Sequence, residues 1–301
     1  MEFLVIGAGS LGSLLGGLLA REHAVTLVGR DPHVGAVRES GLAVDGAVES
    51  HVRPAARTDV PGGRFDCALV TTKAFDTEAA ARDLAAAGVD LDTVLSLSNG
   101  LDNETTLAGH IGAAVLAGTC TYGAMTPEPG VVRCTGVGRT VIGARRGGPS
   151  AAADRVGTAF DEAGIETTVA ADMPRRLWEK LAVNAGINAP TALARAENGA
   201  LLAGPGNAVA RRAAREVARV ARASGVDLSD GEATAAVERV AEATAANTSS
   251  MQQDVLADRR TEVDAILGSA VDRGDDLGVP TPTLRTLADL LRAWERERDL
   301  R

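Results

Sequence analysis

Short apolar runs alternate with helix-period stretches through the first half of the chain. The five residues after Met1 form an apolar run that ends at Gly7. Leucines then recur at helical spacing, at positions 11, 14, 15, 18 and 19, and a second apolar run covers residues 24–28. The pattern predicts a strand, a tight turn, a helix and a second strand, which together form a βαβ unit.

This pattern continues to about residue 168 and then changes. Further short apolar runs lie at 67–71, 93–97, 113–117 and 140–142, with a helical stretch at 78–87 between them. Runs without polar interruption are typical of strands buried on both faces of a parallel sheet. The later spacing is helical, over 174–189, 205–223, 231–246, 251–272 and 283–298. We therefore predict an α/β Rossmann-type parallel-sheet domain over residues 1–168 and an all-α domain over 169–301.

Composition narrows the class of function. The chain has 301 residues, enough for two hydrophobic cores, and its 45% apolar and 24% charged residues are ordinary for globular proteins. A formal charge of −9 with only four Phe, two Trp and one Tyr argues against a nucleic-acid partner, which needs a basic face and stacking rings. Three cysteines without a CxxC pair and four histidines outside metal-ligand spacing indicate neither a disulfide framework nor a metal site.

The apolar N-terminus lacks the features of a targeting segment. Residues 1–20 carry Glu2 where a signal peptide has basic residues, and glycines at 7, 9 and 12 interrupt the run. No stretch of the sequence is long enough to span a bilayer. Together with the cysteine usage, these features predict a cytoplasmic protein without a membrane partner.

The segment between the first strand and the first helix carries a nucleotide-binding pattern. Its six residues, which match GxGxxG, are Gly7, Ala8, Gly9, Ser10, Leu11 and Gly12. In this context the first glycine permits a tight turn, the second admits a pyrophosphate and the third allows close helix packing. The alternative is that the glycines serve only the turn. We predict a dinucleotide site here.

The end of the second strand discriminates between nucleotides. NAD enzymes usually have an acidic residue there for the ribose 2′-hydroxyl, whereas this chain has Arg30 followed by Asp31. A guanidinium can bind a 2′-phosphate through two hydrogen bonds, which favours NADPH over NADH. A shift of one residue would put Asp31 at that position and reverse the preference.

Lysine is scarce in this chain. Only Lys73 and Lys180 are lysines among the 31 Lys and Arg residues. A lysine retained against such a bias is favoured where a guanidinium cannot substitute, as for a proton donor, although chance is the alternative. Lys73 and Asn99 follow predicted strands, at the edge where α/β sheets bind ligands; otherwise they are solvated loop residues.

Amide side chains accompany Lys180 in the helical half. Lys180, Asn184 and Asn188 are four residues apart, which aligns them on one helix face beside apolar residues. Buried amides need hydrogen-bonding partners, and a polyfunctional substrate would supply them. A solvent-facing polar stripe is the alternative.

Hydroxyl residues precede the helix predicted at 251–272. Ser249 and Ser250 suit helix caps, and Glu262 would follow Ser250 by about 18 Å along a continuous helix. Capping explains the serines without any function, and Arg259 is an alternative partner for Glu262.

Taken together, these segments resemble the ketopantoate reductase (2-dehydropantoate 2-reductase) family nearly from end to end. In the family's order and approximate spacing the chain has GAGSLG from Gly7, TTKAF from Thr71, SNG from Ser98, a Pro129-Gly130 segment, KLAVNAGINAPTAL from Lys180, NTSSMQQD from Asn247 and RRTEVD from Arg259. Each motif alone is unspecific, whereas the ordered set is specific.

The resemblance implies an oxidoreductase that uses NADPH to reduce the ketone of ketopantoate, giving pantoate for pantothenate and coenzyme A biosynthesis. It implies that Lys180 is the general acid and that Glu262 orients the substrate or the lysine. The residues it implies for substrate binding are Asn99, Asn184, Asn188, Asn247 and Ser250, and those for the cofactor are the glycine loop, Arg30, Lys73 and Asn99. A homodimer is a family-level expectation.

Two other functions are compatible with the sequence. The chain could reduce another 2-keto acid or substituted ketone, because the family is broad and includes relatives of unknown substrate. It could instead be a catalytically silent NADPH sensor, although a sensor need not retain a proton donor.

Overall fold

The computed structural model describes residues 1–301, and the chain forms two compact units. The sheet unit comprises Met1–Ser98 and Asn103–Met173, and the helical unit comprises Asn99–Asp102 and Pro174–Arg301. The boundary expected after residue 168 lies just before this division. The sequence did not indicate that the short segment Asn99–Asp102, which lies between two parts of the sheet unit in the chain, packs with the helices.

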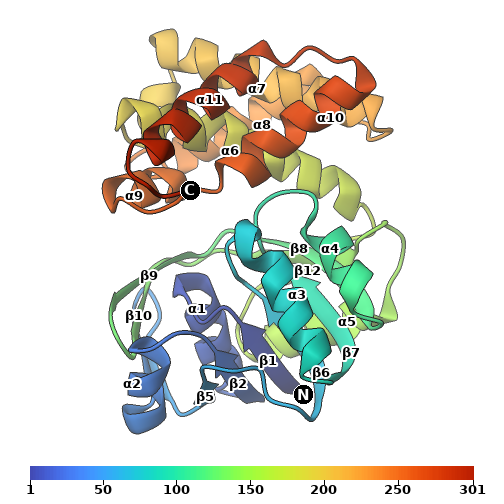
Figure 1. Cartoon of the computed structure of the whole chain (residues 1–301), viewed down its shortest axis with the longest axis vertical. Coiled ribbons are helices and arrows are strands. Elements are labelled where there is room, and N and C mark those ends of the chain that lie inside the picture. The colour runs from blue at the N-terminus through green and yellow to red at the C-terminus, as the bar shows by residue number, and fades with distance from the viewer. The chain divides into compact units, whose positions relative to one another are not determined.

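The sheet unit is built on an eight-stranded sheet of order β12-β11-β8-β7-β6-β1-β2-β5 (Figure 1). Neighbouring strands are parallel except for β8 and β11, which are antiparallel. The strands are β1 Glu2–Ile6, β2 Ala24–Val28, β5 Ala55–Arg57, β6 Arg64–Val70, β7 Asp90–Ser96, β8 Ala114–Cys120, β11 Thr140–Ala144 and β12 Thr167–Val169. Because β1, β2, β6 and β7 are parallel, the loops that follow them meet at one edge.

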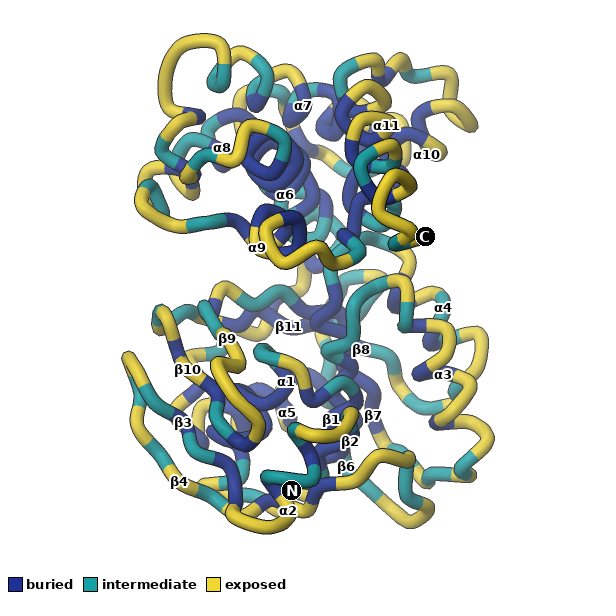
Figure 2. Tube along the Cα trace, turned by 60° about the vertical axis from the view of Figure 1, so that its left-hand side comes forward, coloured by how far each residue is buried: buried dark blue, intermediate teal, exposed yellow.

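Helices cover both faces of this sheet. They are α1 Ser10–Leu19, α2 His33–Ser40, α3 Thr77–Ala86, α4 Asn103–His110 and α5 Ala151–Glu162. Phe3 and Val5 of β1 share a core with α1 and α5, whereas Leu4 and Ile6 share a second core with α3 and α4. Successive strand residues point to opposite faces, so β1 is buried on both, as Figure 2 shows for the central strands.

A second sheet in this unit was not predicted. It has four strands in the order β4-β3-β10-β9, which are β3 Leu42–Gly46, β4 Ser50–Val52, β9 Gly123–Glu128 and β10 Val131–Gly136. β9 and β10 form a hairpin that turns at Gly130, where φ is +80°, and this hairpin lies beside α1 (Figure 1). These strands are short and partly exposed, so they lack the apolar runs that revealed the large sheet.

The helical unit confirms the expected all-α half. Its elements are α6 Met173–Ala194, a 3-10 turn at Asn198–Leu201, α7 Gly204–Ala223, α8 Asp230–Ala243, α9 Ser250–Leu256, a π-helix at Asp264–Gly268, α10 Ser269–Leu277 and α11 Pro282–Arg296. Their core is rich in alanine, and α7 contacts α8, α10 and α11. Buried Glu216 of α7 accepts hydrogen bonds from the backbone N–H groups of Thr283 and Leu284, which start α11.

The prediction of one helix over 251–272 was wrong. α9 ends at Leu256, Asp258 takes φ +47°, and the chain becomes helical again only at Val263. The N–H and hydroxyl of Thr261 donate to Glu295 of α11 instead of to the preceding turn. This tertiary contact competes with the local helix and breaks it, so the distance expected along a continuous helix from Ser250 to Glu262 does not apply.

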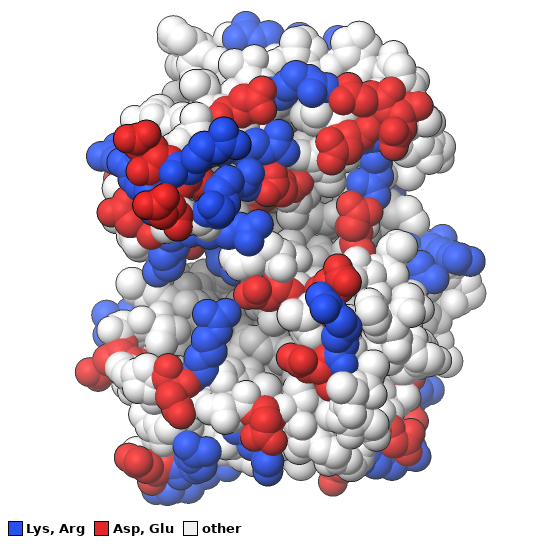
Figure 3. Space-filling view, viewed as in Figure 1, with Lys and Arg blue, Asp and Glu red and all other residues white.

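No helix combines the length and apolarity that crossing a membrane would require. No three or more His, Cys, Asp or Glu side chains are grouped so that they could hold a metal ion, and Cys67, Cys120 and Cys134 are free. Acidic and basic side chains intermingle on the surface seen in Figure 3.

Candidate functional site

The glycine loop has the geometry that close approach of a nucleotide requires. Gly7 has φ +98°, and a Cβ there would lie 2.8 Å from the backbone nitrogen of Thr72. A Cβ on Gly12 would collide with the carbonyl oxygen of Gly7, whereas nothing lies within 4 Å of a Cβ built on Gly9. Gly7 and Gly12 therefore serve the turn and the packing, and Gly9 leaves open space at the start of α1. These residues fit a bound pyrophosphate.

The other loop residues hold this turn in place. Ala8 is buried, and its N–H donates to the carbonyl oxygen of Val28 at 2.9 Å. The Ser10 hydroxyl lies 3.2 Å from that of Thr126 on β9, and Leu11 packs against the core of the sheet unit. Thr71, the first residue of the TTKAF motif, donates its hydroxyl to the carbonyl oxygen of Gly7 at 2.9 Å, a role that the sequence did not indicate. The side chains thus position the loop, and the backbone is left to bind a ligand.

Arg30 and Asp31 point in different directions. The Arg30 side chain is 90% exposed and reaches Asp76 at 3.3 Å, a weak surface ion pair that leaves the guanidinium available to an anion. The Asp31 carboxylate turns toward α2, where one of its oxygens would lie 2.9 Å from a Cβ on Gly35. Both residues are exposed, and of the two only Arg30 carries the positive charge that would attract an anion.

His33 braces the start of α2, and spacing in the sequence gave no signal for it. Its Nδ1 accepts the N–H of Gly130 at 3.1 Å, so its Nε2 carries the proton and donates to the Ser13 hydroxyl at 2.9 Å. Burial lowers the pKa of His33 because it disfavours the charged imidazolium. The neutral ring therefore joins the β9–β10 hairpin to α1 beside the Arg30 loop.

The two predicted loop residues after β6 and β7 belong to different units. Lys73 begins the 3-10 turn Ala74–Asp76 in the sheet unit and is half-buried. The Ser98 hydroxyl donates to the carbonyl oxygen of Thr72 at 2.8 Å, which joins the two strand-end loops. Asn99, the next residue, already packs with the helical unit.

A chain of hydrogen-bonded polar side chains runs through the helical unit, with both ends buried and the middle residue half-buried. Asn184 of α6 donates its amide N–H to Asn99 Oδ1 at 3.2 Å, and Asn99 donates to Glu262 Oε2 at 2.9 Å. Asn184 and Glu262 are only 8% and 6% exposed, so the solvent-facing alternative does not describe this face. Lys180 is half-buried on α6, one turn before Asn184 and on the same face. The structure thus brings Asn99, Asn184 and Glu262 together.

The other predicted substrate residues are less closely connected. Asn188 is 7% exposed, and its amide lies 3.5 Å from the Ser250 hydroxyl, at the outer limit of a hydrogen bond. Ser249, not Ser250, caps α9 by accepting the N–H of Gln252, and it also bonds Thr191 at 2.7 Å. Asn247 is exposed and is tied to neighbouring turns through its backbone.

The backbone next to Glu262 is anchored by a buried carboxylate that the sequence did not reveal. Glu295 is fully buried and accepts the N–H of Thr261 at 2.7 Å and its hydroxyl at 2.6 Å. Its second oxygen accepts from Arg301 at 2.7 Å, which compensates its charge. Arg259 pairs with Asp254, so the alternative pairing with Glu262 is not the one the structure has.

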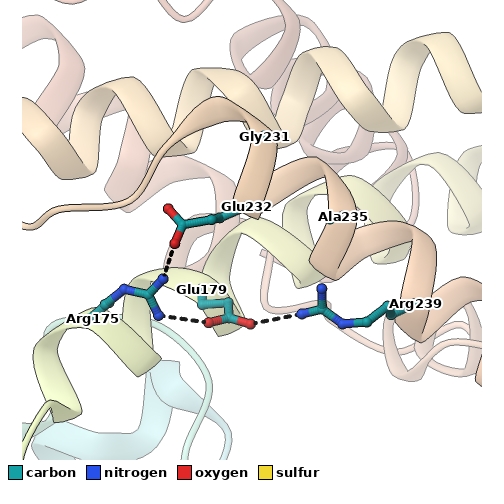
Figure 4. A pocket seen from close by; sticks show the side chains of 6 residues that line it. All are labelled: Arg175, Glu179, Gly231, Glu232, Ala235 and Arg239. Atoms are coloured by element: carbon teal, nitrogen blue, oxygen red, sulfur yellow. Dashed lines mark hydrogen bonds and ion pairs between the residues drawn. The ribbon is translucent and has the colours of Figure 1, made fainter.

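A polar pocket on α6 and α8 is separate from these residues (Figure 4). Arg175 bonds both Glu179 and Glu232, and Glu179 also bonds Arg239. Each charge faces an opposite charge within the pocket. This cluster is an ion-pair network between two helices and includes none of the predicted site residues.

Comparison with known proteins gives consistent matches over both units. Residues 3–147 match the family model described as "Ketopantoate reductase PanE/ApbA", and residues 172–295 match "Ketopantoate reductase PanE/ApbA C terminal". A 2-dehydropantoate 2-reductase of Halobacterium salinarum is 47% identical over 305 residues, covering 99% of this chain and 100% of that protein.

Solved structures with the same fold match nearly the whole chain. A PanE/ApbA family ketopantoate reductase from Ralstonia eutropha has a TM-score of 0.90 and 33% identity, covering 99% of this chain and 100% of its own. A D-mandelate dehydrogenase in complex with NADH has a TM-score of 0.88 and 25% identity, covering 99% of each chain.

Proposed function

Because this chain belongs to the ketopantoate reductase family, we propose that it reduces the ketone of 2-dehydropantoate to pantoate with NADPH as hydride donor. The observation that carries this proposal is the hydrogen-bonded chain Asn184–Asn99–Glu262, with Lys180 one turn away on α6. The Ralstonia eutropha structure and the Halobacterium salinarum relative support the same reaction class.

The chain's own groups suit the nucleotide. Backbone N–H groups at the start of α1 would bind the pyrophosphate where Gly9 leaves room, and Arg30 would bind a 2′-phosphate. Lys73, after β6, would lie near the cofactor. When bound, the nicotinamide supplies the hydride that reduces the ketone carbon.

Lys180 would complete the reduction at the ketone oxygen. Hydride addition converts C=O into an alkoxide, and a lysine ammonium can both stabilise that charge and donate the proton that makes the alcohol. Arginine could do only the first, because it does not release a proton at neutral pH. Glu262 and the amides of Asn99 and Asn184 would orient the substrate or the lysine, and Asn188, Asn247 and Ser250 would bind its hydroxyl and carboxylate.

Another 2-keto acid is the second candidate substrate. The D-mandelate dehydrogenase shares the fold across the whole length of this chain, and it was solved with NADH. Since mandelate, which this enzyme's name gives, is an aryl 2-hydroxy acid, the corresponding aryl 2-keto acid is a suitable competitor. The three free cysteines fit action in the reducing cytoplasm.

A steady-state assay tests the function. Consumption of NADPH with ketopantoate, phenylglyoxylate and pyruvate should give the highest kcat/KM for ketopantoate. A higher value for another acid would transfer the proposal to that substrate. Absence of turnover with every ketone, while NADPH still binds, would favour the sensor alternative and overturn the proposal.

A further inference from the structure

The four-residue segment Asn99–Asp102 is attached to the helical unit at every position. Asn99 is hydrogen bonded to Asn184 and Glu262, and Leu101 packs against the hydrophobic core of the helices. Gly100 has φ +106°, and a Cβ there would lie 2.9 Å from the carbonyl oxygen of Ala265. The segment's backbone therefore lies directly against the π-helix that follows Glu262.

Asp102 closes the segment through Arg273 of α10. The two terminal nitrogens of the Arg273 guanidinium donate to the two Asp102 carboxylate oxygens at 3.2 and 2.5 Å. The side chains of Arg273 and Asp102 are 30% and 60% exposed, and the Arg273 guanidinium also lies 5.9 Å from the centre of the Trp178 ring. A two-point bond held over an aromatic ring restricts orientation as well as distance.

This ion pair is coupled to the π-helix. Arg273 also donates to the backbone carbonyl oxygen of Ser269 at 3.4 Å. The Ser269 hydroxyl in turn donates to the backbone carbonyl oxygen of Ala265 at 2.7 Å. The Ala265 carbonyl is the group against which Gly100 packs. Arg273 thus contacts one end of the segment directly and its middle through Ser269.

We infer that the Asp102–Arg273 pair is a positioning device that keeps the Asn99 amide aligned with Glu262 and Asn184. Neither residue touches the reacting atoms; they act by fixing a segment of four residues at its far end. Gly100 and Leu101 leave little slack between the pair and Asn99, so loosening Asp102 displaces the amide. This inference rests on the proposed function, because it assigns the purpose of the alignment to substrate binding.

The test is Arg273→Met, which keeps an apolar contact with Trp178 and removes both hydrogen bonds to Asp102. We expect kcat/KM for ketopantoate to fall about 10-fold, since a small misplacement of a substrate-binding group is costly. The dissociation constant for NADPH should change by no more than about threefold, because Asn99 is the only one of the predicted cofactor residues that lies in the helical unit. Asp102→Asn, which keeps the shape of the side chain, should show a smaller loss of the same kind.

Arg285→Met is the matched control. Arg285 bonds both oxygens of Asp275 at 2.6 and 2.7 Å, also within the helical unit, but does not contact the segment. It should leave both constants unchanged. Equal kinetic losses in Arg273→Met and Arg285→Met would overturn the inference, because the effect would then be general destabilisation.

Hydrogen exchange separates this inference from the proposed function. A peptide covering 99–102 should exchange several-fold faster in Arg273→Met than in wild type or Arg285→Met, whether or not ketopantoate is the substrate. Unchanged exchange would overturn the inference, and so would faster exchange with wild-type kinetics. If the wild type were inactive but Arg273→Met still showed faster exchange, the positioning role of the Asp102–Arg273 pair would be supported and only the proposed reaction would be overturned.

Discussion

At the scale of single residues, the two lysines differ in what the structure surrounds them with. Lys180 lies one turn from Asn184 on a helix whose polar face is buried, whereas Lys73 begins a short turn after a strand. A half-buried ammonium beside amides is suited to contact with a reacting oxygen. The scarcity of lysine, which drew attention to position 180, is consistent with the proton-donor role that we propose for Lys180.

Lys180→Arg separates proton donation from charge. Arginine retains the positive charge but does not release a proton at neutral pH, so kcat should fall by about 10²- to 10⁴-fold while NADPH affinity hardly changes. Steady-state kinetics at saturating substrate measure this. Lys180→Ala should be partly rescued by a small primary amine. A kcat within a few-fold of wild type in either variant would remove Lys180 from the mechanism.

Arg30 is the second residue whose role a single substitution can settle. Its guanidinium is exposed and only weakly paired, so Arg30→Ala should weaken NADPH by about 10- to 150-fold, the equivalent of about 1.5–3 kcal/mol, and leave NADH nearly unchanged. Fluorescence titration with both cofactors measures this. Arg64→Ala, at the opposite end of the parallel strands, is the control. Equal losses with both cofactors would mean that Arg30 is structural.

At the scale of elements, positions that break a regular pattern place the functional groups. The interruption between α9 and α10 lets Glu295 hold the peptide of Thr261, and Glu262 follows directly. A continuous helix would have bonded that peptide to its own preceding turn. The π-helix after Glu262 also receives Gly100, so the irregular backbone lies where the polar chain is assembled.

The contact of His33 with the β9–β10 hairpin predicts a pH dependence. Burial lowers the pKa of His33 in the folded state below its ordinary value of 6.5. Below about pH 6.5 the unfolded chain therefore binds a proton that the folded chain does not, and the free energy of unfolding decreases as the pH falls through the pKa of the folded state. Above about pH 6.5 His33 is neutral in both states, and the free energy of unfolding no longer depends on its protonation.

His33→Asn tests this at the level of stability. An Asn oxygen can still accept from Gly130, but the bond to Ser13 is lost, so we expect a loss of about 1 kcal/mol at pH 7.5 and a flatter stability profile from pH 6.5 downward. Urea unfolding across pH 5–8 measures both. His110→Asn, at an exposed histidine, should keep the wild-type slope. An unchanged slope in His33→Asn would contradict the assignment.

At the scale of the whole molecule, the residues proposed for the nucleotide and those proposed for the substrate are divided between two units with separate cores. The glycine loop, Arg30 and Lys73 belong to the sheet unit, and Lys180, Asn184, Asn188 and Glu262 belong to the helical unit. Asn99 is the exception, because it lies three residues after the end of β7 and yet packs with the helices. The chain thus passes from the sheet unit to the helical unit at the peptide bond between Ser98 and Asn99.

Local periodicity determined much of this protein without reference to its tertiary structure. Apolar runs identified the central strands, helical spacing identified most of the helices, and the GxGxxG pattern identified the turn before α1. The alignment of Lys180 with Asn184 and Asn188 follows from four-residue spacing alone. Each of these features depends on neighbours within one or two turns, so the sequence contains the information directly.

Tertiary structure alone decided which of these side chains meet. Asn99 bonds a residue 163 positions away, and Asp102 bonds one 171 positions away. The break before Glu262 arises from Glu295, 34 positions beyond Thr261, and the second sheet pairs β3 with a strand almost 90 residues later. No local pattern encodes such contacts, because they gain free energy only once the separate elements have folded and packed together.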